Sequence, residues 1–275
     1  MRKTSFKRIL PLISILLALS SLIIIFSACT GSGNENESSG NGKNESFNYS
    51  FDADISQYLR YLNPNDSQYK LLVNKKNPLG KNYTPSSLVD IDTSLTFLGK
   101  NIELEKYTAM AALAMLAEMK ADGIRGVYIT SGYRTYEKQS SLWYTYIEKE
   151  SNAHPDWSSS RIEQEVLTYS ARPGTSEHQS GLCIDFITGE MTELVNYGSE
   201  TPNNPYDIGF AETVAFEWLS RNAYKFGFIL RYPESKEGIT EYNYESWHYR
   251  FVGQAAAAEM HETGECFEEY LNRIS

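Results

Sequence analysis

Apolar and polar residues recur along this chain with two different periods. Helical spacing is clearest over residues 105–120, where alanine, methionine and leucine repeat every three or four positions. Further helices are predicted at 137–150, 160–170, 213–226 and 254–271. Short β-branched and aromatic runs predict strands at 127–130, 182–186, 228–232 and 247–252. Because helices and strands are mixed without a regular strand–helix–strand rhythm, we predict an α+β fold.

The first 28 residues have the organisation of an export signal. Four basic residues precede a largely apolar stretch over 9–26, and small residues follow it. Ser27 and Ala28 before Cys29 resemble the lipobox of bacterial lipoproteins, in which the cysteine is acylated after cleavage. We therefore expect a signal peptide at 1–28 and a lipid on Cys29. An ordinary signal peptide or an uncleaved membrane anchor is the alternative.

Residues 29–50 follow with glycine, serine, asparagine and glutamate and almost nothing apolar. Such a segment cannot bury a core, so we expect a flexible tether. One folded domain without internal repeats should occupy residues 51–275. Together these features predict a lipid-anchored protein at the cell membrane, with its domain on the extracytoplasmic side.

Composition narrows the class of protein and of partner. The chain has 275 residues, of which 41% are hydrophobic and 22% charged, as in ordinary globular proteins. Its net charge of −10 argues against nucleic acid as a partner, because phosphate binding requires a basic surface. Three cysteines are too few for a disulfide framework.

Histidine is rare enough for each copy to be judged by its surroundings. The chain has four, and His154 and His261 lie in a polar break and on an acidic terminal helix, where we expect surface positions. His178 lies in a turn before the strand that carries Asp185. A carboxylate inside that apolar strand needs a partner, because an unpaired buried charge is costly. His248 ends a second polar segment.

Two imidazoles and one carboxylate form a common zinc set, so His178, Asp185 and His248 are candidate metal ligands. Glu245, three residues before His248, could take a proton from water. Non-haem iron is less favoured, because its histidine and carboxylate often stand one residue apart and here seven positions separate them. Each motif alone also fits a structural role: a turn histidine, a strand-end aspartate, or an exposed Glu–His pair.

A third segment suggests the kind of substrate. Arg134 ends the sequence Ser-Gly-Tyr-Arg at the exit of the strand predicted at 127–130. A guanidinium can hold a carboxylate by two parallel hydrogen bonds, which lysine cannot copy. An arginine opposite a catalytic metal therefore suggests a substrate with a free C-terminal carboxylate.

Three motifs occur in a fixed order: Ser-Gly-Tyr-Arg at 131–134, Ser-x-His-x-x-Gly-x-x-x-Asp at 176–185, and Glu-x-Trp-His at 245–248. Together they resemble the VanY-type D-alanyl-D-alanine carboxypeptidases, zinc peptidases that trim bacterial peptidoglycan stems. The resemblance runs from about residue 71 to residue 252. It implies a hedgehog/DD-peptidase-like fold, in which a small central antiparallel sheet flanked by helices carries the zinc site.

The resemblance also implies a role for each motif residue. His178, Asp185 and His248 would bind Zn²⁺, and Glu245 would be the general base. Arg134 would bind the terminal carboxylate or polarise the scissile carbonyl. The remaining substrate-binding positions would be Gln139, Ser176 and Trp247.

Two positions depart from the family pattern. Cys183 stands where alanine is usual, and Ser246 where proline often precedes the Trp-His pair. Cys183 shares a strand face with Asp185, so we expect it near the metal. Sulfur as a fourth ligand would block the open site. A pairing of Cys183 with Cys266 is left open.

The expected function is zinc-dependent removal of the C-terminal D-alanine from peptidoglycan stem peptides, by D,D- or L,D-carboxypeptidase activity. The alternatives are a non-catalytic lipoprotein that binds the cell wall, and an endopeptidase of the same fold that cuts cross-links. The expected partners are stem peptides and, through Cys29, the membrane. We expect a monomer.

Overall fold

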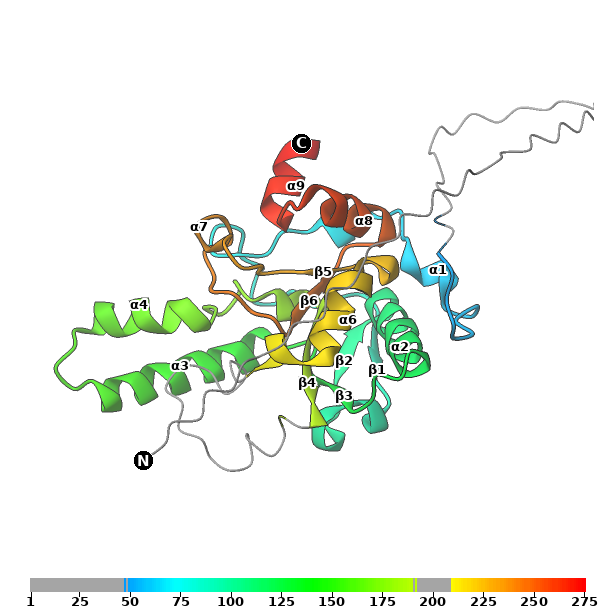
Figure 1. Ribbon diagram of the computed structural model, residues 1–275. Coiled ribbons are helices and arrows are strands. Elements are labelled where there is room, and N and C mark those ends of the chain that lie inside the picture. The colour runs from blue at the N-terminus through cyan, green and yellow to red at the C-terminus, as the bar shows by residue number, and fades with distance from the viewer. Residues whose placement is uncertain (1–46, 48, 190, 192–208) are drawn as a thin grey trace, which may run out of the picture. The chain divides into compact units, whose positions relative to one another are not determined.

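A four-stranded antiparallel sheet forms the centre of the fold (Figure 1). The computed structural model describes residues 47, 49–189, 191 and 209–275, so the predicted signal peptide, Cys29 and most of the tether lie outside it. In spatial order the strands are β3 (Val127–Ser131), β4 (Cys183–Thr188), β6 (His248–Phe251) and β5 (Phe228–Leu230). All four strand predictions are confirmed to within two residues at each end. The mixture of helices and antiparallel strands confirms the α+β class.

A second sheet pairs β1 (Leu88–Asp90) with β2 (Glu103–Glu105). The sequence did not predict it, because three-residue strands leave no measurable alternation of apolar and polar positions.

One face of the central sheet forms the main core. Ile184 and Phe186 on β4 alternate with Cys183 and Asp185, so the apolar pair points to the opposite face from the acid. The core side packs against α2 (Lys106–Ala121) and α6 (Val214–Asn222). Burying one side chain such as Phe186 stabilises the fold by about 1.5–3 kcal/mol. The opposite face of β4, which carries Cys183 and Asp185, is therefore available for polar chemistry.

Helix α2 follows directly from its sequence. Its alanines allow close packing, and most of its length is buried. The Glu105 carboxylate caps the first turn by accepting hydrogen bonds from the N–H groups of Tyr107 and Thr108. Gly123, with φ of 83°, follows the helix end. The predicted helix at 105–120 is confirmed within one residue.

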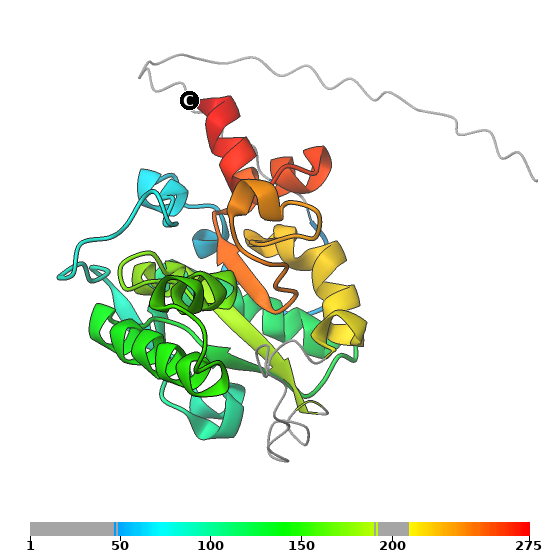
Figure 2. The ribbon, with the colours of Figure 1, turned by 90° about the vertical axis from the view of Figure 1, so that its left-hand side faces the viewer.

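Helices α3 (Tyr136–Ala153) and α4 (Ser159–Tyr169) form a hairpin on the opposite side of the sheet from α2 (Figures 1 and 2). Thr135 and Ser158 cap the two helices at their N-termini. Ile162 and Val166 of α4 are buried. Both helices were predicted, although α3 runs three residues past the predicted end.

The C-terminal region corrects one prediction. The single helix expected at 254–271 is two helices, α8 (Gln254–Thr263) and α9 (Phe267–Ile274). Gly264, with φ of 70°, ends α8, and the Cys266 segment caps α9. The helix expected at 213–226 likewise ends at Asn222 and continues as a 3₁₀ turn.

The described part of the chain also contains two α-helices of four residues, α1 (Leu59–Leu62) and α7 (Glu237–Thr240). The 3₁₀ helices are Ser67–Lys70, Thr93–Leu95, Phe97–Gly99, Glu177–Ser180, Phe210–Glu212 and Ala223–Phe226. Across the described residues, no helix combines the length and the apolar character needed to cross a membrane.

Candidate active site

The turn after β3 shows why its motif contains glycine. A Cβ on Gly132 would lie 2.6 Å from the carbonyl oxygen of Glu103 and 2.6 Å from a methyl carbon of Ile102. No larger residue fits that close approach. The carbonyl oxygen of Gly132 lies 2.7 Å from Nδ1 of His178. The turn therefore fixes the orientation of the His178 ring through its Nδ1 atom.

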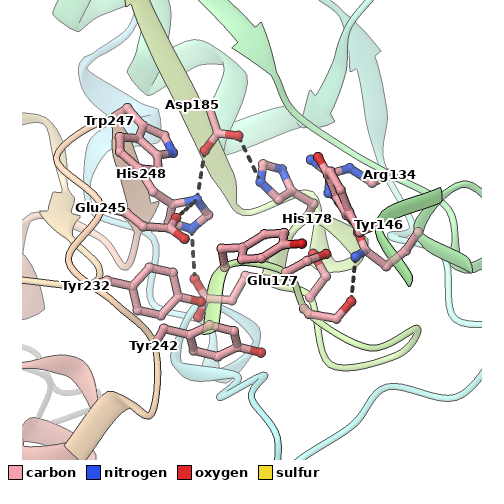
Figure 3. Close-up of a pocket in the computed structure, with 15 residues that line it drawn as sticks. Arg134, Tyr146, Glu177, His178, Asp185, Tyr232, Tyr242, Glu245, Trp247 and His248 are labelled. Atoms are coloured by element: carbon pink, nitrogen blue, oxygen red, sulfur yellow. Dashed lines mark hydrogen bonds and ion pairs between the residues drawn. The ribbon is translucent and has the colours of Figure 1, made fainter. Parts of the chain in front are cut away.

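Antiparallel pairing brings the other candidate ligands together. Asp185 on β4 lies directly opposite His248 on β6. The Asp185 carboxylate lies between two imidazoles, with Oδ1 2.8 Å from Nδ1 of His248 and Oδ2 3.1 Å from Nε2 of His178 (Figure 3). All three side chains are buried. We call His178, Asp185 and His248 the ligand triad.

The ligand triad fits a zinc ion by its chemistry. Because Nδ1 of His178 is engaged by Gly132, its Nε2 is the atom turned to the shared centre. Burial alone would raise the pKa of the Asp185 carboxyl, but the charges and hydrogen bonds of the two histidines hold it below its usual value. The carboxylate is therefore ionised, as a metal ligand must be. Two nitrogens and one oxygen are a usual zinc donor set.

Cys183 lies beside the ligand triad, as its strand face predicted. Its Sγ and one ring nitrogen each of His178 and His248 all lie within 4.8 Å of one another. Sulfur is also an ordinary zinc donor. Both cysteines in the described part of the chain, Cys183 and Cys266, are buried free thiols, so they do not pair with each other.

Glu245 reaches the same centre from the loop before β6. Its backbone N–H donates to the carbonyl oxygen of Tyr232, and its Oε2 lies 3.9 Å from Nδ1 of His248. The alternative of an exposed Glu–His pair is wrong, because only 15% of the Glu245 side chain and 4% of the His248 side chain are exposed. Burial raises the pKa of the Glu245 carboxyl to about 7. A group that titrates there can exchange protons near neutral pH.

Arg134 lies on the opposite side of the pocket in a fixed orientation (Figure 3). Nη1 donates to Oε1 of Gln139 over 2.7 Å, and Nη2 donates to Oγ of Ser131 over 3.0 Å. Gln139 in turn donates to the carbonyl oxygen of Ala171. Since a guanidinium has five N–H donors, others are left for a ligand.

All predicted metal-binding, catalytic and substrate-binding residues line one cavity of about 100 Å³. They are Arg134, Gln139, Ser176, His178, Asp185, Glu245, Trp247 and His248. His154 and His261 do not line this cavity; the His154 side chain is 41% exposed and His261 is also exposed, as predicted.

The sequence did not predict seven other residues of the cavity wall: Tyr146, Tyr169, Ser170, Ala171, Glu177, Tyr232 and Tyr242. Tyr146 and Tyr169 come from the α3–α4 hairpin, and Tyr232 and Tyr242 come from the segment between β5 and β6. No sequence pattern links these two regions. Glu177 is the residue that the second motif leaves unspecified, directly before His178. Its only signal was an acid within an otherwise buried segment.

Comparisons with known proteins agree with this geometry. Residues 101–254 match the family VanY, described as D-alanyl-D-alanine carboxypeptidase. A D-alanyl-D-alanine carboxypeptidase of Enterococcus faecalis is 34% identical over 202 residues, which cover 74% of this chain and 65% of that protein.

Two solved structures are similar in fold and sequence. The LdcB LD-carboxypeptidase has a TM-score of 0.57 at 33% identity, covering 73% of this chain and 84% of its own. The vancomycin-resistance D,D-pentapeptidase VanY was solved in complex with Zn(II). It has a TM-score of 0.56 at 31% identity, and the match covers 74% of this chain and 99% of that chain. The three motifs, the shared cavity and these similarities lead to one conclusion: the chain belongs to the VanY family of D-alanyl-D-alanine carboxypeptidases.

Proposed function

We propose that this protein is a zinc-dependent carboxypeptidase that removes the C-terminal D-alanine from peptidoglycan stem peptides. The observation that carries the proposal is that the ligand triad, the acid Glu245 and the guanidinium of Arg134 all face one cavity. The relatives support it, because one is a D-alanyl-D-alanine carboxypeptidase and another was solved with zinc.

The ligand triad would hold zinc through Nε2 of His178, Nδ1 of His248 and an oxygen of Asp185. When bound, zinc supplies a Lewis acid that polarises the scissile carbonyl and makes water more acidic. The donor atoms of the three residues converge on one centre, as a metal site requires.

Glu245 carries the proton transfers. Its carboxylate takes a proton from the water that attacks the carbonyl carbon of the last amide bond. It then gives that proton to the amide nitrogen as the carbon–nitrogen bond breaks. The products are a stem with a new terminal carboxylate and free D-alanine.

Arg134 supports cleavage at a chain end. Its side chain is held by Gln139 and Ser131, so remaining N–H groups can bind a terminal carboxylate without first being ordered. An endopeptidase substrate has no carboxylate at this position. This feature favours the carboxypeptidase over the endopeptidase alternative.

The proposal is tested by Glu245→Gln, which keeps the shape of the side chain and removes its charge. We expect zinc content to be unchanged and kcat to fall by about 10²- to 10⁴-fold, the usual contribution of general acid–base catalysis. Metal analysis and D-alanine release measure the two effects. An active Glu245→Gln protein would refute the assigned role. Stem-peptide binding without hydrolysis by zinc-loaded wild type would instead support the non-catalytic alternative.

The amide bond that is cut can be of the D,D or the L,D type. An LD-carboxypeptidase and a D,D-pentapeptidase are both similar in fold to this chain. A D,D-enzyme shortens pentapeptide stems, whereas an L,D-enzyme removes D-alanine from tetrapeptide stems. Mass spectrometry of each purified stem after digestion distinguishes the two activities.

We also propose that a lipid on Cys29 anchors the protein outside the cytoplasmic membrane, where peptidoglycan lies. Support comes from the small residues before Cys29 and from the polar tether after it. Labelling of cells with a tagged fatty acid should mark the wild type but not a Cys29→Ala variant. An unlabelled wild-type protein found in the medium would contradict the anchor.

A further inference from the structure

A buried network of charges lies directly behind the ligand triad. Glu177 is its central member, with a fully buried side chain. Oε1 of Glu177 accepts hydrogen bonds from Nε of Arg231 and from Nη1 of Arg250, both over 2.8 Å. Arg231 also forms a two-pronged pair with Glu268 on α9, over 2.7 and 2.8 Å. Two acids thus balance two bases away from water.

The second oxygen of Glu177 is used differently. Among the described residues Oε2 has no hydrogen-bond partner, and neither has Nε2 of His248. These two buried atoms face each other over 3.5 Å (Figure 3). An unpaired polar atom in the interior is costly, so two such atoms at this separation indicate a complementary pair.

The tautomer of His248 explains the pairing. Its Nδ1 faces Asp185 and the shared centre, and must lack a proton to bind a metal. The proton of a neutral ring is then on Nε2, which points at Glu177. His178 follows the same rule with the opposite atoms, because its Nδ1 faces the carbonyl oxygen of Gly132. Each histidine of the ligand triad therefore has a separate acceptor for its N–H.

We propose that Glu177 is a positioning residue, whose Oε2 accepts the Nε2–H of His248 and so fixes the tautomer that binds metal through Nδ1. Arg231 and Arg250 hold the carboxylate in place. Glu268 extends the network to α9 but does not contact His248. This inference rests on the proposed zinc site and adds a residue outside the ligand triad.

The two acids provide a test variant and a matched control. Arg231 and Arg250 require an acceptor at the Oε1 position of residue 177. In Glu177→Gln the side-chain carbonyl would fill that position and turn the NH₂ group toward His248. Two donors would then face each other, which favours the tautomer with the proton on Nδ1. Glu268→Gln removes a charge from the same network and leaves the contact with His248 intact.

Zinc affinity is measured by chelator competition in the absence of substrate. We expect Glu177→Gln to bind zinc about 10- to 100-fold more weakly than wild type, the usual effect of losing such a partner, and Glu268→Gln to stay within about threefold. Equal weakening in both variants would overturn the proposal, because the network would then act only through folding. Unchanged affinity in Glu177→Gln would also overturn it.

A measurement on wild type keeps the test valid if Glu177→Gln does not fold. In the zinc-loaded protein with ¹⁵N-labelled histidine, NMR should show a proton on Nε2 of His248 that exchanges slowly with water. A proton on Nδ1, or one on Nε2 that exchanges rapidly, would overturn the proposal. If wild type binds zinc but cleaves no D-alanyl peptide, the proposed function fails while the role of Glu177 stands. If wild type binds no zinc, both fail.

Discussion

The pocket has two halves that are built in different ways. The metal half consists of the ligand triad on and beside two hydrogen-bonded strands, and its side chains are buried. The substrate half consists of Arg134 and the α3–α4 hairpin, where Tyr146 and Tyr169 are only half-buried. The comparison suggests that changes in the metal half abolish function, whereas changes in the substrate half alter it by degrees.

The two halves differ in how their polar atoms find hydrogen-bond partners. In the metal half one carboxylate serves two imidazoles, and each imidazole has a second acceptor behind it. No member can be lost without leaving another unpaired in the interior. In the substrate half, water can replace a missing partner at the half-buried groups, so the cost is smaller.

The largest expected effect is that of Asp185→Ala. The variant should bind no zinc, and kcat/KM should fall by about 1,000-fold or more, because several kcal/mol of Lewis-acid stabilisation is lost. The metal-free protein should also lose about 3–5 kcal/mol of stability, since two buried histidines lose their shared partner. Metal analysis, D-alanine release and denaturant unfolding in chelator measure these effects. Asp90→Ala, at an exposed position, is the control. Stoichiometric zinc in Asp185→Ala would show that the metal half does not depend on this carboxylate.

A smaller effect is expected for Arg134→Lys in the substrate half. Lysine keeps the charge but cannot bind a carboxylate with two parallel hydrogen bonds. We expect kcat/KM to fall by about 10- to 100-fold, the equivalent of one charge-assisted hydrogen bond, with full zinc content. Steady-state kinetics on purified stems test this. Loss of zinc in the same variant would show that the two halves are not independent.

Tyr169→Phe should act on the hairpin alone. The Tyr169 hydroxyl donates to Oε1 of Glu150 over 2.8 Å, a bond that links α4 to α3. Removing it should lower stability by about 1 kcal/mol, with zinc affinity unchanged. Thermal unfolding together with chelator competition gives both values. A large loss of zinc would mean that the hairpin also holds the metal half.

The smallest effect is expected for Cys183→Ala, which places in this site the residue usual for the family. We expect full zinc content and kcat/KM within about twofold of wild type, because the ligand triad is complete without sulfur. Cobalt(II) substitution tests the alternative of a sulfur ligand. A thiolate charge-transfer band in wild type that Cys183→Ala lacks, together with faster turnover in the variant, would show that Cys183 restricts the open site.

Much of the candidate site could be predicted because each of its motifs is local. Ser-Gly-Tyr-Arg is a continuous run at the end of a strand, and an acid inside an apolar strand signals a partner wherever it lies. The close approach that requires glycine at position 132 involves Ile102 and Glu103, which only the folded chain brings near. The elements were predicted for the same reason, since helical and strand periods act over a few turns. The errors fell at 254–271 and 213–226, where a left-handed glycine and a 3₁₀ turn end helices whose apolar pattern continues.

The order and type of residues along the chain show which side chains can do chemistry here, namely two imidazoles, two acids and an arginine in three ordered motifs. The pairing of Asp185 with His248 across two strands, and the presence of Glu177 and four tyrosines in the cavity wall, follow from the folded structure alone. The physical reason is that residue type and local spacing encode donors, acceptors and periodicity, whereas antiparallel register and helix packing bring together residues more than sixty positions apart.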